Sequence, residues 1–172
     1  MRLIFKTFME VILLRKGPED LPRSQLLLAL AVAMIVVAQL LLHALVETDY
    51  NADLVLDFAT ELVKIGLYVA ILFLSGFISR TIQTITAIIG CTAIMVLLFV
   101  VIVLFSRPFI GLELAGAIAW FVTPWLILVE GHIISRSIQQ HWFTGISIAV
   151  MIFILQLGFY LTFSGIPEGT VG

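Results

Sequence analysis

Long apolar stretches separated by short polar segments dominate this chain. They cover residues 25–46, 62–78, 83–105, 112–129 and 142–163, and the second is the shortest, with Lys64 near its start. A spanning helix needs ~20 residues, with a range of ~17–25, so all five stretches are long enough. Uniformly apolar runs of this length are typical of helices, whereas strands of a membrane barrel form alternating segments of roughly ten residues. The pattern therefore predicts an all-α integral membrane protein with five transmembrane helices within residues 25–165, followed by a short tail at 166–172.

Composition supports a lipid environment. Hydrophobic residues make up 62% of the 172 residues and charged residues 12%, against ~45–50% and ~25% in a typical soluble domain. No run of Lys and Arg points to a nucleic-acid partner. The single cysteine, Cys91, excludes an intramolecular disulfide and a multi-cysteine metal site.

Basic residues are distributed unevenly along the chain. Five precede the first apolar stretch, namely Arg2, Lys6, Arg15, Lys16 and Arg23. If the chain crosses the membrane at each stretch, Arg80 and Arg136 lie on the same side, whereas the 47–61 segment on the other side has no Lys or Arg. Positively charged loops remain in the cytoplasm. We therefore expect a cytoplasmic N-terminus and an outside C-terminus, in a bacterial inner membrane.

Residues 1–16 have the pattern of an amphipathic helix. Arg2, Lys6 and Glu10 fall on one stripe and apolar side chains cover much of the remainder. This predicts an interfacial helix in contact with membrane lipids; the alternative is a cytoplasmic helix packed on the bundle. A cleaved signal peptide is disfavoured, because the charged sequence RKGPED follows where small residues should be.

Residues 17–24 are predicted to form a corner between this helix and the first span. Lys16 suits the C-terminal end of a helix, Gly17 suits the position just after it, and Pro18 cannot continue it. Either Asp20 or Ser24 can then cap the first span.

An acidic stripe precedes the second span. Asp53, Asp57 and Glu61 lie at helical i, i+4, i+8 spacing, and Lys64 is close enough to pair with Glu61. Stacked carboxylates could bind a divalent cation or a basic partner. The favoured interpretation is a solvated face on helical turns outside the bilayer.

Four ionisable residues are predicted near the outer ends of the spans: His43, Glu47, Lys64 and Glu113. They could cluster as a proton or ion relay, or they could pair locally at the interface. No acidic residue falls in a predicted mid-membrane position, which disfavours an ion-coupled transporter.

The fourth span contains Pro124, which removes a helix hydrogen bond, frees the carbonyl of Trp120 and makes Pro124 a candidate hinge. The next segment carries four polar residues that we interpret as a cytoplasmic surface loop, because their spacing fits no zinc pattern: Glu130, His132, Arg136 and His141.

Small residues recur every four positions on three spans. They are Gly66 and Ala70; Gly111, Ala115 and Ala119; and Gly145 and Ala149. Small side chains let membrane helices approach closely, so these positions predict helix-packing faces within a compact bundle or toward a partner.

Two segments carry a family resemblance. "EDLPRSQLLLAL", at 19–30, leads a proline into the first span, and "WLILVEGHIISRSIQQHW", at 125–142, joins the last two spans. With the five-span layout, they resemble the Yip-type family of five-span membrane proteins and its small bacterial relatives. The resemblance implies a scaffold or membrane-organising protein without catalysis.

No catalytic motif is present: the chain has no GxSxG, HExxH, P-loop or paired cysteines. We expect no enzymatic activity, cofactor or metal. The leading hypothesis is an accessory or scaffold subunit of a membrane complex, with other membrane subunits or further copies as partners. The alternative is a small transporter or channel component with a hinge at Pro124 and an outer polar cluster. A continuous polar cavity reaching the middle of the bundle would favour transport.

Overall fold

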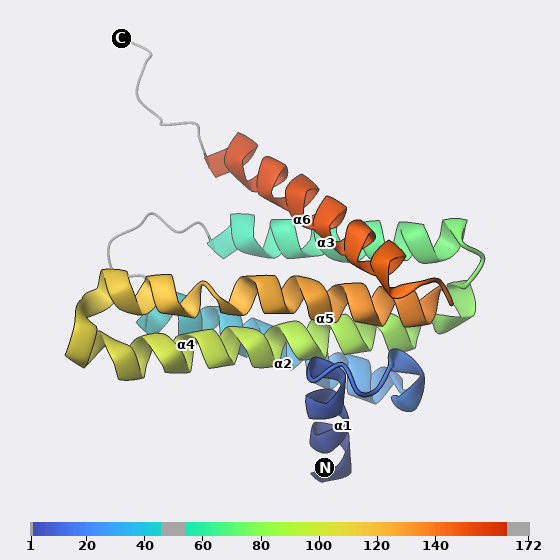
Figure 1. The fold of residues 1–172 in the computed structure, drawn as a ribbon, viewed down its shortest axis with the longest axis horizontal. Coiled ribbons are helices and arrows are strands. Elements are labelled where there is room, and N and C mark those ends of the chain that lie inside the picture. The colour runs from blue at the N-terminus through green and yellow to red at the C-terminus, as the bar shows by residue number, and fades with distance from the viewer. Residues whose placement is uncertain (1, 46–53, 165–172) are drawn as a thin grey trace.

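The structure is a computed structural model that describes residues 2–45 and 54–164. Every regular element in these two ranges is helical (Figure 1). The elements are α1 (Arg2–Ile12), η1 (Pro18–Asp20), α2 (Gln25–Leu45), α3 (Leu54–Leu74), η2 (Ile78–Arg80), α4 (Thr81–Ala119), α5 (Val122–Ser137) and α6 (Trp142–Ser164). The all-α fold class is therefore confirmed.

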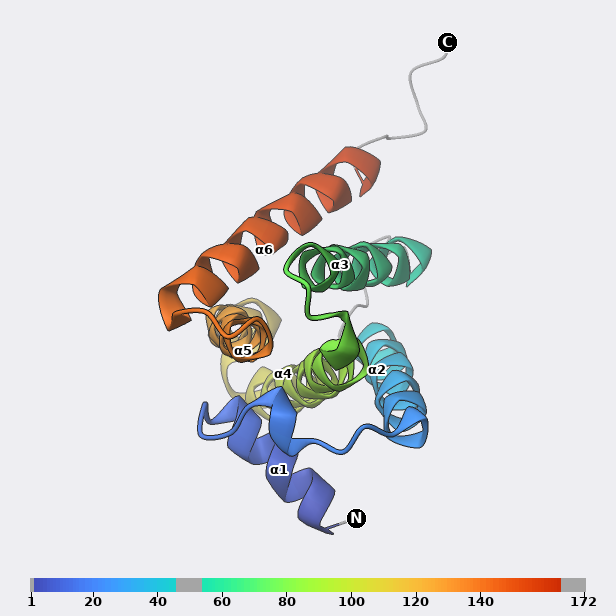
Figure 2. The same ribbon diagram turned by 90° about the vertical axis from the view of Figure 1, so that its right-hand side faces the viewer.

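Four helices run side by side along the long axis of the molecule. These are α2, α3, α4 and α5; α6 crosses them obliquely, and α1 lies nearly perpendicular to the bundle (Figures 1 and 2). Along α4, the consecutive residues 84–93 are all buried. A helix buried on all sides is the centre of its bundle, and in the end-on view α4 lies between α1, α2, α3 and α5 (Figure 2).

Within residues 2–45 and 54–164, four segments are long and apolar enough to cross a membrane, which is compatible with a membrane location. They are Gln25–Leu45, Ile78–Gly111, Glu113–Ser137 and Trp142–Ser164. At 21 residues, α3 has sufficient length, but it carries Asp57, Glu61 and Lys64, and charged side chains in a span are unfavourable.

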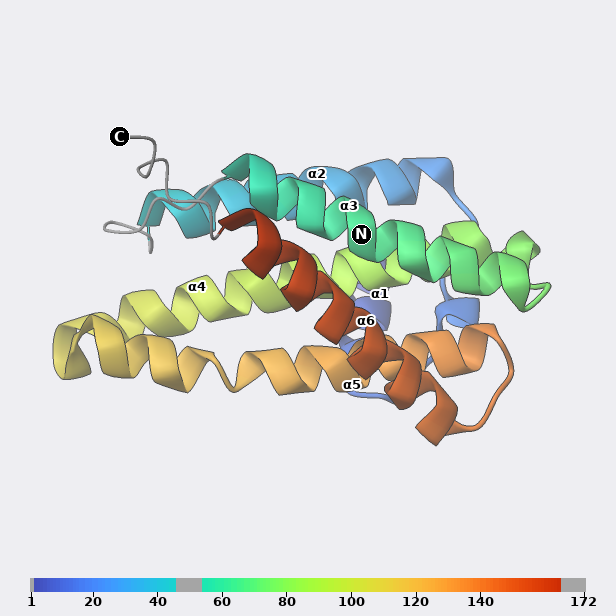
Figure 3. The ribbon, with the colours of Figure 1, turned by 90° about the horizontal axis from the view of Figure 1, so that it is seen from above.

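The third and fourth apolar stretches are joined by a sharp reversal at Gly111. Gly111 has φ 82°, a conformation that glycine adopts readily and other residues rarely do. There α4 turns back, and its last turns continue toward α5 (Figures 1 and 3). Gly111 is exposed and a side chain there would meet nothing within 4 Å, so it contacts no helix in the described part of the chain. A packing face toward a partner at this position stays a prediction.

The proline in the fourth stretch accompanies a helix break and not a bend inside one helix. The α-helical hydrogen-bond pattern is broken at residues 120–121, which keep right-handed helical backbone angles, and α5 begins at Val122 with Pro124 in its first turn. Proline is tolerated there, because the first turn has no partner for its backbone nitrogen. The carbonyl of Trp120 accepts a hydrogen bond from the Thr123 amide at 3.0 Å. Pro124 as a hinge stays a prediction.

The predicted small-residue faces have different environments. Gly145 and Ala149 of α6 are buried, and a side chain added at Gly145 would meet the Gly131 carbonyl and Ser135 of α5. Ala115 is fully buried beside Val103. In contrast, Gly66 and Ala70 are exposed on the outside of α3. The side chain of Ala119 lies outside the described part of the structure.

The first helix is shorter than predicted and packs on the bundle. It ends at Ile12, and Leu14 takes the left-handed conformation, with φ 59°. The amides of Leu14 and Arg15 donate to the carbonyls of Val11 and Glu10, which forms a Schellman motif. Leu14 therefore occupies the left-handed position after the helix that the sequence predicted for Gly17.

Contacts of α1 with the bundle involve both α4 and α5. Phe8 is buried and its ring lies directly over Gly90, where a side chain would collide with it. The Trp125 indole donates a hydrogen bond to the carbonyl of Ile12 at 3.1 Å. Beyond the end of α1, the Lys16 ammonium hydrogen-bonds Glu10 at 2.8 Å and holds the pKa of that carboxyl below its usual range.

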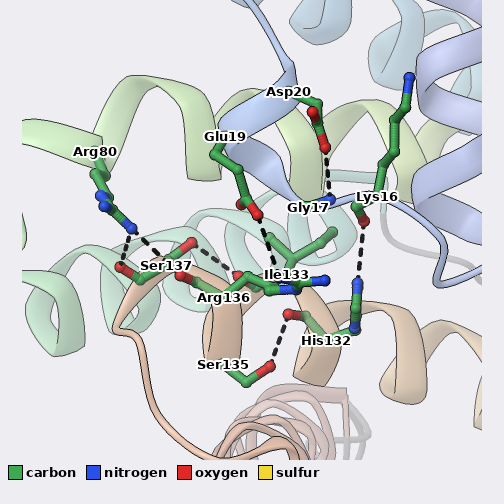
Figure 4. Close-up of polar contacts among 10 residues, drawn as sticks. All are labelled: Lys16, Gly17, Glu19, Asp20, Arg80, His132, Ile133, Ser135, Arg136 and Ser137. Atoms are coloured by element: carbon green, nitrogen blue, oxygen red, sulfur yellow. Dashed lines mark hydrogen bonds and ion pairs between the residues drawn. The ribbon is translucent and has the colours of Figure 1, made fainter.

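The predicted corner is present and is attached to the end of α5 (Figure 4). Ser24 accepts a hydrogen bond from the Leu27 amide at 3.3 Å and so caps α2, which resolves the choice between Asp20 and Ser24. Asp20 instead accepts a bond from the Gly17 amide at 3.2 Å. Glu19 forms an ion pair with Arg136 at 3.7 Å.

This attachment corrects the interpretation of residues 130–141 as a surface loop. Glu130, His132 and Arg136 all belong to α5, and His132 is buried with its ring 3.0 Å from the carbonyl of Lys16. Of the four residues, His141 alone lies in the connection before α6. Arg80 donates to the carbonyls of Arg136 and Ser137 at 3.4 Å, which ties the start of α4 to the end of α5 (Figure 4).

The glycine contact between α5 and α6 predicts a difference between two matched substitutions. Gly145→Leu should lower the free energy of unfolding by about 1–3 kcal/mol or more, since the side chain must displace the α5 backbone. Gly66→Leu makes the same chemical change at an exposed helical position and should not destabilise the protein. Thermal unfolding in mild detergent measures both. Equal melting temperatures would contradict the close α5–α6 approach.

Candidate functional site

A buried lysine lies at the midpoint of α3. Lys64 is only 3% exposed, and its ammonium contacts Glu61 at 2.9 Å and Glu130 at 3.0 Å. The Glu61 contact confirms the pairing predicted from their three-residue spacing. The Glu130 contact joins two helices, α3 and α5, at positions 66 residues apart in the sequence.

Glu130 is held by two further groups, one from α3 and one from α4. Its second carboxylate oxygen accepts a hydrogen bond from the Tyr68 hydroxyl at 2.9 Å, and Tyr68 is completely buried. The Thr92 hydroxyl of α4 donates to the first oxygen at 3.3 Å. Lys64, Tyr68 and Thr92 therefore fix the orientation of the carboxylate. We call Glu61, Lys64, Tyr68, Thr92 and Glu130 the lysine–carboxylate cluster.

All members of the cluster except Tyr68 line a cavity of about 330 Å³ in the bundle. The cavity extends from Lys64 and Glu130 toward the end of the bundle where α2 ends and α3 begins, since Leu42 and Asp57 also line it. All five long helices contribute side chains. Its polar lining includes Gln39, Asp57, Thr60, Glu61, Lys64, Thr92, Thr123, Glu130, Gln156 and Tyr160.

A second ion pair joins α2 to α3 at Asp57, which lines this cavity. The imidazole of His43, in the last turn of α2, lies 3.1 Å from the Asp57 carboxylate, in the first turn of α3. Asp57 and Glu61 occupy successive turns of one helix face. Ionisable groups thus follow one another from His43 at the end of the bundle to Glu130 at its middle.

Burial makes this arrangement energetically demanding. Removing a charged group from water costs several kcal/mol, and an ion pair offsets that only when its remaining polar atoms are also hydrogen-bonded. Lys64 meets that condition through Glu61 and Glu130 together. The charges are unequal, however. Asp57, Glu61 and Glu130 supply three carboxylates, and Lys64 and a protonated His43 supply at most two positive charges.

The structure unites some of the predicted site residues and separates others. Asp57, Glu61 and Lys64 line the cavity, and His43 contacts Asp57. The predicted inclusion of Glu113 is wrong, because that residue follows the reversal at Gly111 and is exposed. Glu47 and Asp53 lie outside the described residues.

The interpretation of the acidic stripe as a solvated face is also wrong for its described members. Glu61 is buried and Asp57 is three-quarters buried. Both carboxylates line the cavity, which Leu42 of α2 and Tyr160 of α6 also line. Asp57 in addition contacts His43 of α2. In residues 2–45 and 54–164, no three His, Cys, Asp or Glu side chains converge as metal ligands would.

Glu130 is the residue that sequence reasoning assigned incorrectly. The polar composition after the apolar stretch predicts a loop from Glu130 onward. In the structure α5 continues for seven residues beyond Glu130, to Ser137. One signal for its role was present. A lysine inside a span needs a partner. The apolar residues Ile133 and Ile134, which are buried in the structure, follow Glu130 and indicate that the helix continues past it.

Comparisons with protein-family models, with curated proteins and with solved structures give no match for this chain. The resemblance to the Yip-type family therefore stays a prediction, and the function must be argued from the geometry of the site.

The unequal charges predict an unequal response to removing each partner. Lys64→Met should lower the free energy of unfolding by about 3–5 kcal/mol, because it leaves buried carboxylates without a cation. Glu130→Gln should lower it by less, since Glu61 still pairs with Lys64 and the amide oxygen can accept the Tyr68 bond. Arg107→Met, an exposed basic position, is the matched control. Chemical or thermal unfolding in detergent checks this order, and an equal loss for the first two variants would contradict it.

Proposed function

We propose that the protein is a small, non-enzymatic membrane transporter component that binds a polar solute in the cavity beside the lysine–carboxylate cluster. The observation that carries the proposal is the contact of Lys64 with Glu130 on the wall of a 330 Å³ cavity. Ionisable residues within membrane helices are unfavourable, and they commonly mark substrate or ion pathways. A purely structural scaffold can be built from apolar and small residues alone.

The shape of the cavity supports the same function. It extends from the middle of the bundle toward one end and contains groups from all five long helices. Binding sites of transporters lie near the membrane midplane, where helices can move around them. Two discontinuities are close to this site: the break at residues 120–121 and Pro124 in the first turn of α5, which also supplies Thr123 and Glu130 to the cavity.

The proposed membrane arrangement has five spans, with α3 as the span that carries the cluster. The charged side chains of α3 face the cavity, and its outer face carries Leu62, Gly66 and Ala70, which suits lipid. The N-terminus and α1 lie on the cytoplasmic side of a bacterial inner membrane, with α1 at the interface, and the C-terminus lies outside. The excess of basic residues before α2 supports this orientation.

One observation favours a second candidate, an accessory or scaffold subunit. The small residues Gly66 and Ala70 are exposed on α3, and no atom lies within 4 Å of a side chain placed at Gly66. An exposed pair with this spacing allows close approach of another helix, from a partner subunit or a second copy. This candidate does not require the buried charges.

Orientation can be tested with single cysteines in a Cys91→Ala background. A cysteine at Thr48, between α2 and α3, should react with a membrane-impermeant maleimide in intact cells. A cysteine at Gln140, between α5 and α6 at the opposite end of the bundle, should react only after permeabilisation. The reverse pattern would contradict the proposed orientation.

Transport can be tested with purified protein in proteoliposomes on a solid-supported membrane. Concentration jumps of small amines, carboxylates, amino acids and inorganic salts should produce a current with at least one class. Lys64→Met or Glu130→Gln should reduce that current at least about tenfold, in keeping with the loss of a buried charged contact. Glu113→Gln, which changes an exposed acid outside the cavity, should retain it. If none of these solutes gives a current with the unsubstituted protein, the proposal fails and the scaffold function is favoured.

A further inference from the structure

The chemistry of the cavity wall restricts what can occupy it. Two carboxylates of α3, Asp57 and Glu61, lie on one side. Much of the remaining wall is apolar or aromatic, and it includes Val96, Leu126, Phe153, Leu157 and Tyr160. The volume of 330 Å³ equals that of about ten water molecules at ~30 Å³ each, so a ligand of similar size fits.

The charge of the wall favours a positively charged occupant. Three carboxylates face at most two positive charges, those of Lys64 and of His43 when protonated. A net negative charge on a largely apolar wall is unfavourable, and a cationic ligand would offset it. An anion would increase the excess, and a neutral solute would leave it unchanged.

A bare metal ion does not match this wall. Across the described residues, no three acidic, His or Cys groups converge on one point, whereas hard cations take six or more oxygen ligands. Apolar and aromatic walls contribute little to such an ion. They do suit the hydrocarbon part of an organic cation, and Phe153 and Tyr160 offer ring faces that attract ammonium groups.

Lys64 itself shows that this environment accommodates an alkylammonium group. Its side chain is a four-carbon chain ending in an ammonium, and that ammonium is held between two carboxylates at 2.9 and 3.0 Å. Asp57 lies one helical turn before Glu61 and also lines the cavity. Its carboxylate therefore extends the acidic wall beyond the Lys64 site.

We propose that the cavity binds a small organic monocation, with its ammonium group between Asp57 and Glu61 and its apolar body against Leu126, Phe153 and Leu157. The inference rests on the proposed function, because it names the class of solute that the transporter component recognises. Lys64 and protonated His43 supply two positive charges opposite the three carboxylates, and the bound cation supplies the third.

The test uses the full-length protein in mild detergent at pH 8 and constant ionic strength, with n-butylammonium as the probe. Two compounds with a similar apolar chain serve as controls: pentanamide is neutral and pentanoate is anionic. Butylammonium should raise the melting temperature in a saturable manner, whereas the two controls and an equal concentration of sodium chloride should not.

Variants separate binding in the cavity from an effect on the detergent. Glu61→Gln should raise the half-saturating concentration of butylammonium at least about tenfold, as expected for loss of a buried charged contact. Val96→Phe, which fills the cavity and keeps every carboxylate, should raise it as well. Glu113→Gln should not change it. If Glu61→Gln unfolds during purification, Val96→Phe and Asp57→Asn provide the same comparison.

Several results would overturn the inference. Equal shifts in the unsubstituted protein and in Val96→Phe would show that the probe acts outside the cavity. A saturable shift with sodium alone would indicate a metal-ion site, and no shift with any cation would show that the cavity takes no cation from solution. Butylammonium binding without any current in proteoliposomes would keep this inference and reject transport, whereas currents from anions alone would keep transport and reject the inference.

Discussion

A lysine ammonium in the interior of an apolar bundle must have partners, and the contacts of Lys64 with Glu61 and Glu130 determine how α3 meets the other helices. Glu61 provides a partner from the same helix, and Glu130 provides one from α5. Tyr68 and Thr92 complete the hydrogen bonding of Glu130. Glu130 thereby contacts α3 at a second residue and also contacts the central helix α4. Because an unpaired buried charge is strongly destabilising, these contacts restrict the register of α3 against both helices.

The other parts of the bundle are held by contacts of a different kind. At the α5–α6 crossing, Gly131 and Gly145 allow the backbones to approach, and a side chain at Gly131 would lie 2.8 Å from the Cα of Ile146. At the opposite face, Phe8 fills the space over Gly90 and attaches α1 to the bundle. Close packing accounts for these contacts without any polar group. The buried charges are thus concentrated around one cavity, and this concentration is the main reason to regard the cavity as the functional part of the molecule.

Much of the fold could be predicted from local sequence signals. Four of the apolar stretches correspond to α2, α3, α4 and α6, because the hydrophobic length needed to cross a lipid bilayer is read directly from consecutive residues. The stretch at 112–129 is divided between the end of α4 and the start of α5. Ser24 at the start of α2 and the Glu61–Lys64 pair were also predictable, since a cap and an i, i+3 contact depend only on neighbouring residues. Local signals failed where polar residues continue a helix. The end of α5 resembles a loop in composition, but its polar side chains meet η1, α3 and α4.

The sequence by itself therefore determined the all-helical class, the order of the apolar helices and the corner before α2, because each follows from hydrophobic length or from capping within a few residues. Only the tertiary structure decided that Glu130 lies opposite Lys64, that Glu113 lies apart from it, and that Gly145 is packed whereas Gly66 is exposed. The physical reason is the same in each case. The stability of a buried charge or of a small residue depends on which distant helix lies beside it, and helices of similar hydrophobicity carry no local signal of their neighbours.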